Sequence, residues 1–572
     1  MPTPPSPRRL ASGALALCAA AALGAQAPFD LLITEVMPDP TPAAGLPEVE
    51  YVELHNPSDA PLPLGAFALA RGDDEPFALP DTLLGPGGYL ALTADATGDP
   101  RFAAAPGLPA LTNAGARLRL FAADGAVVDE VDYRPSWHRA GLRDGGYALE
   151  RVDLARPCHL GAANWTSSTS LAGGTPGAAN AAAGELPADS LRVTAVRPLG
   201  AGGLLLETNR VLDAASEASL ALVDAAGAER RPLSVGRTPG ALASIDVRLA
   251  DPLATGGYGR VALSPRASSC AADERVSRES VAYGVPAAPT PGDWAVNEMM
   301  YDPLAGDGRY VELVNVGTSL LSTGGVRLAR LADDGAVAAV AAVEGELLVA
   351  PGGFVVLAAD PPALLARFPG ARPAAVAAAD LPALGDAECL LLFDAAAELA
   401  LEEVCYDARW HNRAYANTDG VSLERIAVEL PGADASNWTS AAVAAGGGTP
   451  TRANSQASPP VDPAGLPEGA FALAAERLSP DGDGYEDVLA VRFRFAEAGT
   501  LVTFTVLDLR GRAVYTSEED VSAGRAGAWT WDGVDDDGAV VPVGTYVLRA
   551  SAFGAGRRER VEYLGFSVVG RL

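Results

Sequence analysis

Apolar and polar residues alternate with a period of two along most of the chain. Residues 51–54 and 89–92, for example, are short alternating or apolar runs, and such runs break at Pro, Gly or Asp-Gly. Strands this short, with turns about every 8–12 residues, are typical of antiparallel β-sandwiches. Only residues 362–368 (P-A-L-L-A-R-F) indicate a helix, of one or two turns. The pattern predicts an all-β protein, and a length of 572 residues predicts a multidomain array.

The chain contains one long internal repeat. Short motifs recur in the same order about 260–275 residues further on. The matching pairs are I-T-E-V-M-P-D-P (33–40) with V-N-E-M-M-Y-D-P (296–303), E-Y-V-E-L-H-N (50–56) with R-Y-V-E-L-V-N (309–315), P-G-G-Y (86–89) with P-G-G-F (351–354), Trp137-His138 with Trp410-His411, L-E-R (149–151) with L-E-R (423–425), N-W-T (164–166) with N-W-T (437–439), and G-G-T-P (173–176) with G-G-T-P (447–450). Two copies indicate a duplication, because a solenoid needs at least three stacked units.

These motifs resemble the bacterial lamin-tail domain, which is an immunoglobulin-like (Ig-like) β-sandwich. The resemblance covers about 29–180 and again about 293–455, including the N-W-T…G-G-T-P…A-N segment at the end of each copy. The strand-rich segment between the copies looks like a bacterial Ig-like module. Near the C-terminus, S-P-D-G-D-G-Y-E-D (479–487), W-D-G (531–533) and V-G-T-Y (543–546) resemble the Ig-like domain of flagellar hook-capping and gliding-associated surface proteins. That resemblance implies a role in secretion, such as type IX secretion, or in anchoring.

The N-terminus has the pattern of a secretory signal peptide. Arg8 and Arg9 precede an apolar run of small residues at 11–23, and small residues follow it. The run is too short to span a membrane, and we expect no transmembrane segment in the mature chain. The predicted domains are a signal peptide (1–25), a first lamin-tail domain with its C-terminal extension (26–182), an Ig-like module (186–288), a second lamin-tail domain with extension (289–455), a linker (456–468) and a C-terminal Ig-like domain (469–572). We expect a bacterial protein that is secreted or held at the outer cell surface.

The chain is strongly acidic. Its 72 acidic and 42 basic residues give a net charge of −30 at pH 7. A protein that binds duplex nucleic acid needs a cationic face to neutralise phosphates, so we expect no nucleic-acid partner. For a ligand at the cell surface, the alternatives of polysaccharide, protein and mineral stay open.

One hairpin of the first copy has a register that can be counted. Asp124-Gly125 is a two-residue turn signal, so the numbers of paired residues should sum to 249. This register places Arg117 opposite Asp132 and Arg119 opposite Glu130, with an apolar pair on the other face. Opposite charges that face each other in this way stabilise a hairpin. The sequence therefore predicts two ion pairs on one face of a half-buried hairpin.

The cysteines indicate disulfide bonds. After cleavage of the signal peptide the chain has Cys158, Cys270, Cys389 and Cys405. An even number of cysteines in an oxidising compartment predicts disulfides. Aligning the two hairpins puts Cys389 at the position of Arg117 and Cys405 at that of Asp132, which predicts a disulfide across the second hairpin. Cys158 and Cys270 are then the remaining pair by elimination.

Each copy carries two glutamates on short strands near its start. They are Glu35 and Glu53 in the first copy and Glu298 and Glu312 in the second. If the strands pair, two carboxyl groups approach closely, which raises one pKa or recruits a cation. A paired acid/base site is one interpretation. The other is that the carboxylates accept hydrogen bonds from arginine or from the backbone, and we favour it because the repeat supplies no catalytic partner.

The remaining candidate residues are histidines and aspartates. His138 and His411 recur beside Trp137 and Trp410, where a structural role beside a buried indole competes with a ligand role. We find no Gly-x-Ser-x-Gly motif for a hydrolytic triad.

A candidate calcium loop opens the C-terminal domain. Asp481, Asp483 and Asp487 have the spacing of many extracellular calcium loops, and glycines allow the chain to wrap around an ion. The alternative is a cluster of Asx turns. We otherwise expect no cofactor.

The sequence predicts a non-catalytic secreted or cell-surface protein that acts in adhesion, binding or structural spacing. Lamin-tail modules also accompany exported hydrolases. The alternatives are therefore an accessory protein of an exported hydrolase system, or a hydrolase that uses the paired glutamates. Once the four modules are assigned, no segment is left for a separate catalytic domain.

Overall fold

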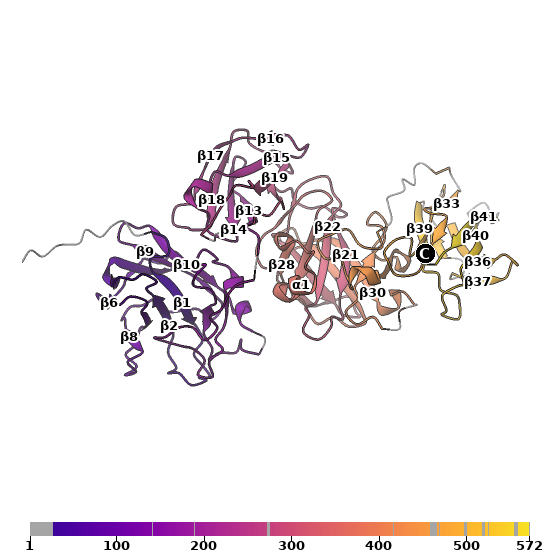
Figure 1. The fold of residues 1–572 in the computed structure, drawn as a ribbon. Coiled ribbons are helices and arrows are strands. Elements are labelled where there is room, and N and C mark those ends of the chain that lie inside the picture. The colour runs from indigo at the N-terminus through magenta and orange to yellow at the C-terminus, as the bar shows by residue number, and fades with distance from the viewer. Residues whose placement is uncertain are drawn as a thin grey trace, which may run out of the picture. The chain divides into compact units, whose positions relative to one another are not determined.

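The structure, a computed structural model, describes residues 27–570 except 140, 188, 271–274, 414, 416, 458–465, 468–469, 497–499, 518–520, 524–525 and 554–558. The predicted signal peptide and most of the predicted linker lie outside the described residues. The chain divides into two compact units, residues 1–188 with 239–242, and residues 189–238 with 243–572. Both units are built from β-strands, as Figure 1 shows. Within the described ranges, no helix has both the length and the apolar character that crossing a membrane requires.

The first copy of the repeat is a two-layer β-sandwich. Its strands are β1 (Leu32–Met37), β2 (Tyr51–His55), β3 (Leu62–Pro63), β4 (Phe67–Arg71), β5 (Phe77–Ala78), β6 (Leu83–Leu84), β7 (Tyr89–Thr93), β8 (Phe102–Ala104), β9 (Ala116–Ala122), β10 (Val127–Tyr133), β11 (Leu149–Arg151) and β12 (Trp165–Ser167). Six strands form one sheet in the order β12-β11-β1-β2-β7-β8, and four form the other in the order β10-β9-β4-β5. Alternate residues such as Ile33, Leu54 and Leu118 are fully buried between the sheets, which explains the period of two.

The second copy has the same topology. Its strands are β21 (Trp294–Met300), β22 (Tyr310–Asn315), β23 (Leu321–Ser322), β24 (Val326–Leu331), β25 (Val337–Ala341), β26 (Leu348–Val349), β27 (Phe354–Ala358), β28 (Val376–Ala378), β29 (Ala387–Asp394), β30 (Leu399–Asp407), β31 (Leu423–Arg425) and β32 (Trp438–Ser440). The sheet orders β28-β27-β22-β21-β31-β32 and β25-β24-β29-β30 reproduce those of the first copy. The repeated motifs therefore occupy equivalent places in two equivalent sandwiches.

One α-helix, α1 (Pro361–Arg367), lies between β27 and β28 of the second copy. The sequence predicts the helix at residues 362–368, and the structure begins and ends it one residue earlier. Asp360 caps its N-terminus by accepting a hydrogen bond from the Ala363 amide, and proline follows at the first helical positions, where no amide donor is needed.

The other two modules are also β-sandwiches. The strands before the second copy are β13 (Val193–Pro198), β14 (Gly203–Thr208), β15 (Leu220–Asp224), β16 (Glu229–Arg230), β17 (Pro232–Arg237), β18 (Ser244–Leu249), β19 (Tyr258–Leu263) and β20 (Val281–Gly284). The C-terminal strands are β33 (Phe471–Leu473), β34 (Arg477–Leu478), β35 (Leu489–Arg494), β36 (Thr500–Asp508), β37 (Ala513–Thr516), β38 (Val521–Ala523), β39 (Ala526–Trp531), β40 (Gly544–Phe553) and β41 (Glu559–Val568). Their strand pairs are antiparallel except β34 with β41. Each module has an apolar core of its own. The protein is all-β and multidomain.

The central strands of the six-stranded sheets are buried on both faces. Every residue of β1, β2, β21 and β22 is buried, although only one face of each sheet packs on the other sheet. In β1 the register shifts between Ile33 and Glu35, so Thr34 is an extra residue. In β21 it shifts between Val296 and Glu298 in the same way. The polar residues of these strands therefore lie on an outer face that something else covers.

The counted hairpin has the predicted register but a different ion pair. Arg117 lies opposite Asp132 and Arg119 opposite Glu130, and one extra residue next to the turn is accommodated between Val127 and Asp129. The prediction that each arginine binds the acid opposite it is wrong. Arg117 instead contacts Glu130 at 2.5 Å, diagonally across the hairpin, and Asp132 pairs with Arg134 of its own strand end at 2.8 Å.

Candidate functional site

Three glutamates meet on the outer face of the first six-stranded sheet. Glu35 lies opposite Glu53 on β2 and opposite Glu150 on β11, so one carboxylate has another on each side. All three side chains are fully buried. The sequence predicted the approach of Glu35 and Glu53 but did not include Glu150 as a site residue. Its recurrence in the repeated L-E-R motif was the available signal.

The C-terminal segment of the same copy donates hydrogen bonds to this carboxylate cluster. The amide and hydroxyl of Thr175, in the G-G-T-P motif, donate to Glu35 at 3.0 and 3.2 Å. The Gly177 amide donates to Glu53 at 2.6 Å, and the Ala182 amide donates to Glu150 at 2.6 Å. We call residues 168–182 the first tail. It lies along the sheet because its backbone donors match three buried acceptors.

Side chains of the sheet complete the bonding of the first cluster. Tyr51 donates its hydroxyl to Glu35, and the extra residue Thr34 donates to Glu53 at 2.9 Å. The Thr175 hydroxyl also contacts Glu150 at 3.0 Å. Buried carboxyl groups are costly unless they are hydrogen-bonded, and here each of the three is.

The second copy builds the same cluster from Glu298, Glu312 and Glu424, all fully buried. Residues 441–456 form the second tail. Its donors are the amides of Thr449 to Glu298 (2.8 Å), Thr451 to Glu312, and Gln456 to Glu424 (2.9 Å). Tyr310 donates to Glu298 at 2.7 Å, and Asn297 takes the place of Thr34 by donating to Glu312 at 2.8 Å. The predicted linker therefore begins later, because residue 456 still belongs to the second tail.

The double glycine of each tail follows from this close approach. A Cβ atom on Gly174 would lie far inside van der Waals contact of the Tyr51 hydroxyl and the Glu35 carboxylate. A Cβ atom on Gly448 would lie 2.8 Å from the Glu298 carboxylate and closer still to the Tyr310 hydroxyl. The glycine before each has a φ of +90° or +100°, which a side chain disfavours. The G-G-T-P motif is thus explained by how the tail meets the cluster.

Burial shifts the acidity of the clustered glutamates. Removal from water raises the pKa of Glu35 to about 7 and, with the neighbouring Glu35 charge, raises the pKa of Glu53 to about 9. Burial together with Glu424 raises the pKa of Glu298 to about 7. Burial and the neighbouring Glu298 charge raise the pKa of Glu312 well above its ordinary value. Each cluster therefore retains protons at neutral pH.

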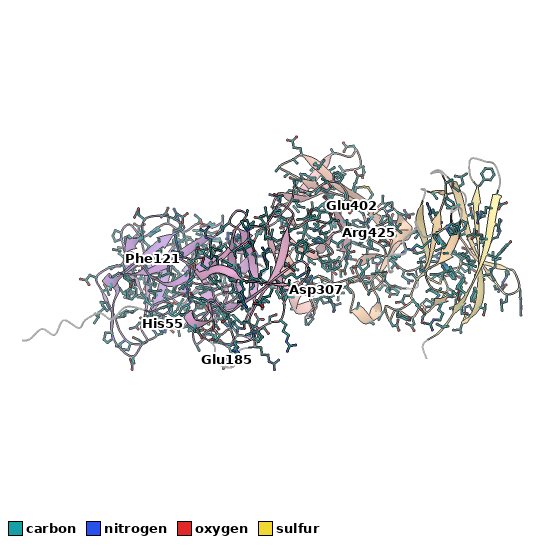
Figure 2. All side chains as sticks on the ribbon, turned by 90° about the horizontal axis from the view of Figure 1, so that it is seen from above. His55, Phe121, Glu185, Asp307, Glu402 and Arg425 are labelled. Atoms are coloured by element: carbon teal, nitrogen blue, oxygen red, sulfur yellow. A yellow bond between two sulfur atoms is a disulfide. The ribbon has the colours of Figure 1, made fainter. Side chains whose placement is uncertain are left out.

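An ion pair lies next to each cluster. Its arginine stands on the same short strand as the third glutamate of the cluster. Arg151 pairs with Asp129 at 2.9 Å, and both side chains are fully buried. Arg425 pairs with Glu402 at 2.8 Å, and Figure 2 shows these two residues next to each other. The acid also accepts a backbone amide of the strand at the position where the register shifts, Ile33 for Asp129 and Val296 for Glu402. These pairs fix the irregular strand that carries Glu35 or Glu298.

The tryptophan–histidine motifs occupy equivalent structural positions. His138 lies 3.0 Å from the Ser167 hydroxyl through its Nδ1 atom, and His411 lies 2.7 Å from the Ser440 hydroxyl. Burial lowers the pKa of each histidine to about 4, so both are neutral at pH 7. The adjacent indole of Trp137 or Trp410 packs within 6.4 Å of the tryptophan of the N-W-T motif. These contacts favour the structural interpretation over the ligand interpretation.

The three aspartates of the predicted calcium loop do come together. Their ligand atoms lie within 4.8 Å of one another. Asp487 is buried and accepts the Gly482 and Gly484 amides at 2.7 Å, while Asp481 and Asp483 accept amides two residues ahead. These are the Asx turns of the alternative interpretation, and calcium binding stays a prediction.

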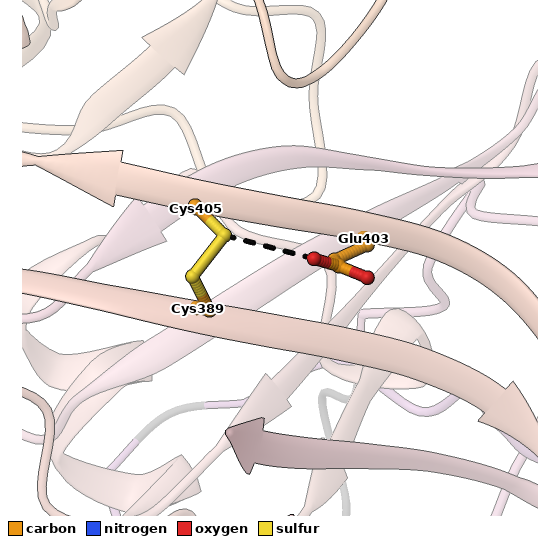
Figure 3. The surroundings of a disulfide bond; sticks show 3 residues. All are labelled: Cys389, Glu403 and Cys405. Atoms are coloured by element: carbon orange, nitrogen blue, oxygen red, sulfur yellow. Dashed lines mark hydrogen bonds between the residues drawn. A yellow bond between two sulfur atoms is a disulfide. The ribbon is translucent and has the colours of Figure 1, made fainter. Parts of the chain in front are cut away.

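The cysteine pair of the second hairpin is bonded. Cys389 lies opposite Cys405 on neighbouring strands, with Cα atoms 3.9 Å apart, and a disulfide joins them. Figure 3 shows the bond on the hairpin, with the Glu403 carboxylate 3.8 Å from the Cys405 sulfur. Cys158 and Cys270 are also disulfide-bonded. Their pairing with each other stays a prediction.

The sequence of the first copy also matches a known family. Residues 25–135 match the Lamin Tail Domain model. Residues 478–556 match the model of the FlgD Ig-like domain. No curated protein sequence matches the chain. The G-G-T-P tail of the first copy lies beyond the residues that the lamin-tail model matches.

Solved structures match the chain only at a low level. They include CopC from Methylosinus trichosporium OB3b (20% identity, 14% of this chain and 78% of that one, TM-score 0.12). They also include domains 1–6 of the surface layer protein SbsC (11% identity, 67% and 55%, TM-score 0.16) and a tetra-tandem repeat of a large adhesion protein (13%, 94% and 99%, TM-score 0.14). The chain thus spans about half the length of the SbsC structure. At these TM-scores the likeness carries no argument about function.

Proposed function

We propose that this protein is a non-catalytic secreted or cell-surface protein that acts in adhesion, binding or structural spacing. The observation that supports the proposal best is the use made of the six clustered glutamates. Each is fully buried, and each accepts hydrogen bonds from its own chain, above all from backbone amides of the tail. A carboxyl group that holds two segments together has no free face for a substrate.

Three further proposals belong to this function. The second copy is a second lamin-tail domain, which the repeated motifs and the identical strand order support. The chain is exported, which its signal-like N-terminus and its disulfide-bonded cysteines support, since disulfides persist in oxidising compartments. The C-terminal domain serves secretion or anchoring, which rests on its resemblance alone.

One observation favours the competing hydrolase. Glu35 and Glu298 have pKa values raised to about 7, as a general acid at neutral pH requires. A substrate could reach them only if the tail left the sheet, and this would break the bonds to Thr175 or Thr449. The proposal of a non-catalytic role therefore depends on the tail staying in place.

Cell fractionation tests the proposed location and role. Cells that produce the full chain, or the chain without residues 467–572, are separated into cytoplasm, envelope and medium, and intact cells are treated with protease. The proposal predicts full-length protein in the envelope or medium, accessible to protease, and a changed distribution after truncation. Full-length protein confined to the cytoplasm with reduced cysteines would contradict it.

A further inference from the structure

A cavity of about 370 Å³ lies in the second compact unit, between strands of the Ig-like module and the second copy of the repeat. Its charged lining residues are Arg260, Arg372, Arg452 and Glu279. Three bases to one acid is the reverse of the whole chain, in which acids outnumber bases 72 to 42. A cavity with this lining attracts anions although the protein as a whole repels them.

The three arginines are not used in ion pairs. Among the residues that the structure describes, none of the three has a carboxylate within 4.0 Å. Arg260 and Arg372 are half-buried and Arg452 is exposed, whereas the half-buried Arg237 pairs with an acid. An arginine offers five N–H donors in a planar fork that suits carboxylate, sulfate and phosphate groups. All three arginines line one cavity, which they share with Glu279, and in the described part of the chain no carboxylate lies within ion-pair distance of their guanidinium groups.

Arg372 is held by an unusual threonine. The Thr451 hydroxyl accepts the Arg372 amide at 2.7 Å, and the Thr451 carbonyl accepts the Arg372 Nε at 3.2 Å. Thr451 is buried and has a φ of +67°, a conformation that disfavours a β-branched side chain. Strain of this kind persists where surrounding structure imposes it, and it collects at binding sites.

The first copy lacks the threonine and the tail arginine of the second copy. The tail reads G-G-T-P-T-R-A-N in the second copy and G-G-T-P-G-A-A-N in the first, so Gly177 and Ala178 stand where Thr451 and Arg452 stand. Gly177 adopts the same backbone conformation, with a φ of +79°, without strain. In the first copy the residue that lies beside Gly177 is Arg101, and its guanidinium group pairs with Asp99 at 2.5 Å. The contacts between the tail and the glutamate cluster, which both copies share, therefore need neither Thr451 nor Arg452.

We propose that Arg260, Arg372 and Arg452 bind the oxyanion of a small ring-sized organic molecule, such as the carboxylate of an acidic sugar. The volume lies at the lower end of the roughly 300–1,000 Å³ range of small-ligand pockets. Phe354 and Leu348 line the same cavity and provide an apolar wall for the face of a ring. A carboxylate on the arginines and a ring against this wall use both parts of the lining. The inference does not depend on the proposed function, because such a site serves an adhesin and an enzyme equally.

Calorimetric titration of the full mature chain tests the site. The probes are galacturonate, neutral galactose and inorganic phosphate, each at low and at high salt. We expect galacturonate to bind and galactose not to bind, with weaker binding at high salt. Hydrogen bonds to charged groups imply that Arg372→Ala and Arg452→Ala each weaken binding by roughly tenfold or more. Arg409→Ala, which removes an exposed arginine that pairs with Asp407, should leave binding unchanged.

The variant Thr451→Gly tests whether the positioning of Arg372, as distinct from its charge, contributes to binding. This variant keeps all three arginines and restores the residue of the first copy, so the fold should persist while loss of the hydroxyl contact to Arg372 weakens binding. Binding of phosphate but not of galacturonate would support the oxyanion site and overturn the proposal that its ligand is an acidic sugar. Failure of both anions to bind, or binding that the double variant Arg372→Ala with Arg452→Ala leaves unchanged, would overturn the site itself.

Discussion

Replacing Gly174 by alanine should detach the first tail from its sheet. The added Cβ overlaps the Tyr51 hydroxyl and the Glu35 carboxylate, and both side chains are fully buried and cannot move away. Overpacking of this kind costs about 1–3 kcal/mol. If the tail shifts, the Thr175 bonds to Glu35 also weaken, and a hydrogen bond to a charged group is worth about 1.5–3 kcal/mol. A combined cost of about 3 kcal/mol raises the population of the detached tail roughly a hundredfold.

Hydrogen exchange measured by mass spectrometry reports this directly. The amides of Thr175, Gly177 and Ala182 donate to the glutamates, so a peptide that covers residues 170–184 should be protected in the original chain. In Gly174→Ala the same peptide should exchange much faster. Gly161→Ala is the matched control, because its Cβ would meet nothing within 4 Å. Equal protection in Gly174→Ala and the original chain would show that attachment of the tail does not depend on this glycine.

Because burial raises the pKa of Glu53 from 4.5 to about 9, its contribution to stability is fully present below about pH 4.5 and is lost as the pH rises to 9, at up to about 1.4 kcal/mol per pH unit. Urea unfolding at pH 5, 7 and 9 measures the free energy of unfolding against pH, and Glu53→Gln should remove this slope. An unchanged slope in the variant would show that Glu53 does not cause it. Changing Cys389 and Cys405 together to serine should lower the free energy of unfolding of the second copy by about 3 kcal/mol, because the bond closes a loop of about 15 residues; a urea midpoint that does not move on reduction would exclude that contribution. If Asp481, Asp483 and Asp487 bind calcium, the ion at a hundred times its dissociation constant should stabilise the C-terminal domain by about 2.7 kcal/mol, and a shift in melting temperature that survives Asp483→Ala would exclude the site.

Local pattern was enough to predict the strands and one hairpin register. The alternation of Leu118 and Arg119 follows the faces of β9, and a turn signal fixed which residues lie opposite each other. The ion pair was mispredicted because register gives the opposite residue, whereas Arg117 reaches the diagonal Glu130. Side-chain length and burial, which the pattern does not contain, decide between the two acids.

The carboxylate cluster was only half predictable. Glu35 and Glu53 lie on strands that are neighbours in sequence, so their approach could be expected. Glu150 comes from a three-residue strand that joins the sheet after the rest of the sandwich is complete. The tail donor Thr175 is 140 residues away from Glu35. Contacts at that separation depend on the assembled topology, and in the sequence only the repeated L-E-R and G-G-T-P motifs mark them.

A broad hydrolase screen of the mature chain beside the variant Glu53→Gln with Glu312→Gln asks whether the glutamates only bind the tails or also take part in a reaction. If they only bind the tails, neither protein turns over a substrate, and both tails exchange hydrogen faster in the variant. Turnover by the original chain that the double substitution abolishes would show that the glutamates are catalytic.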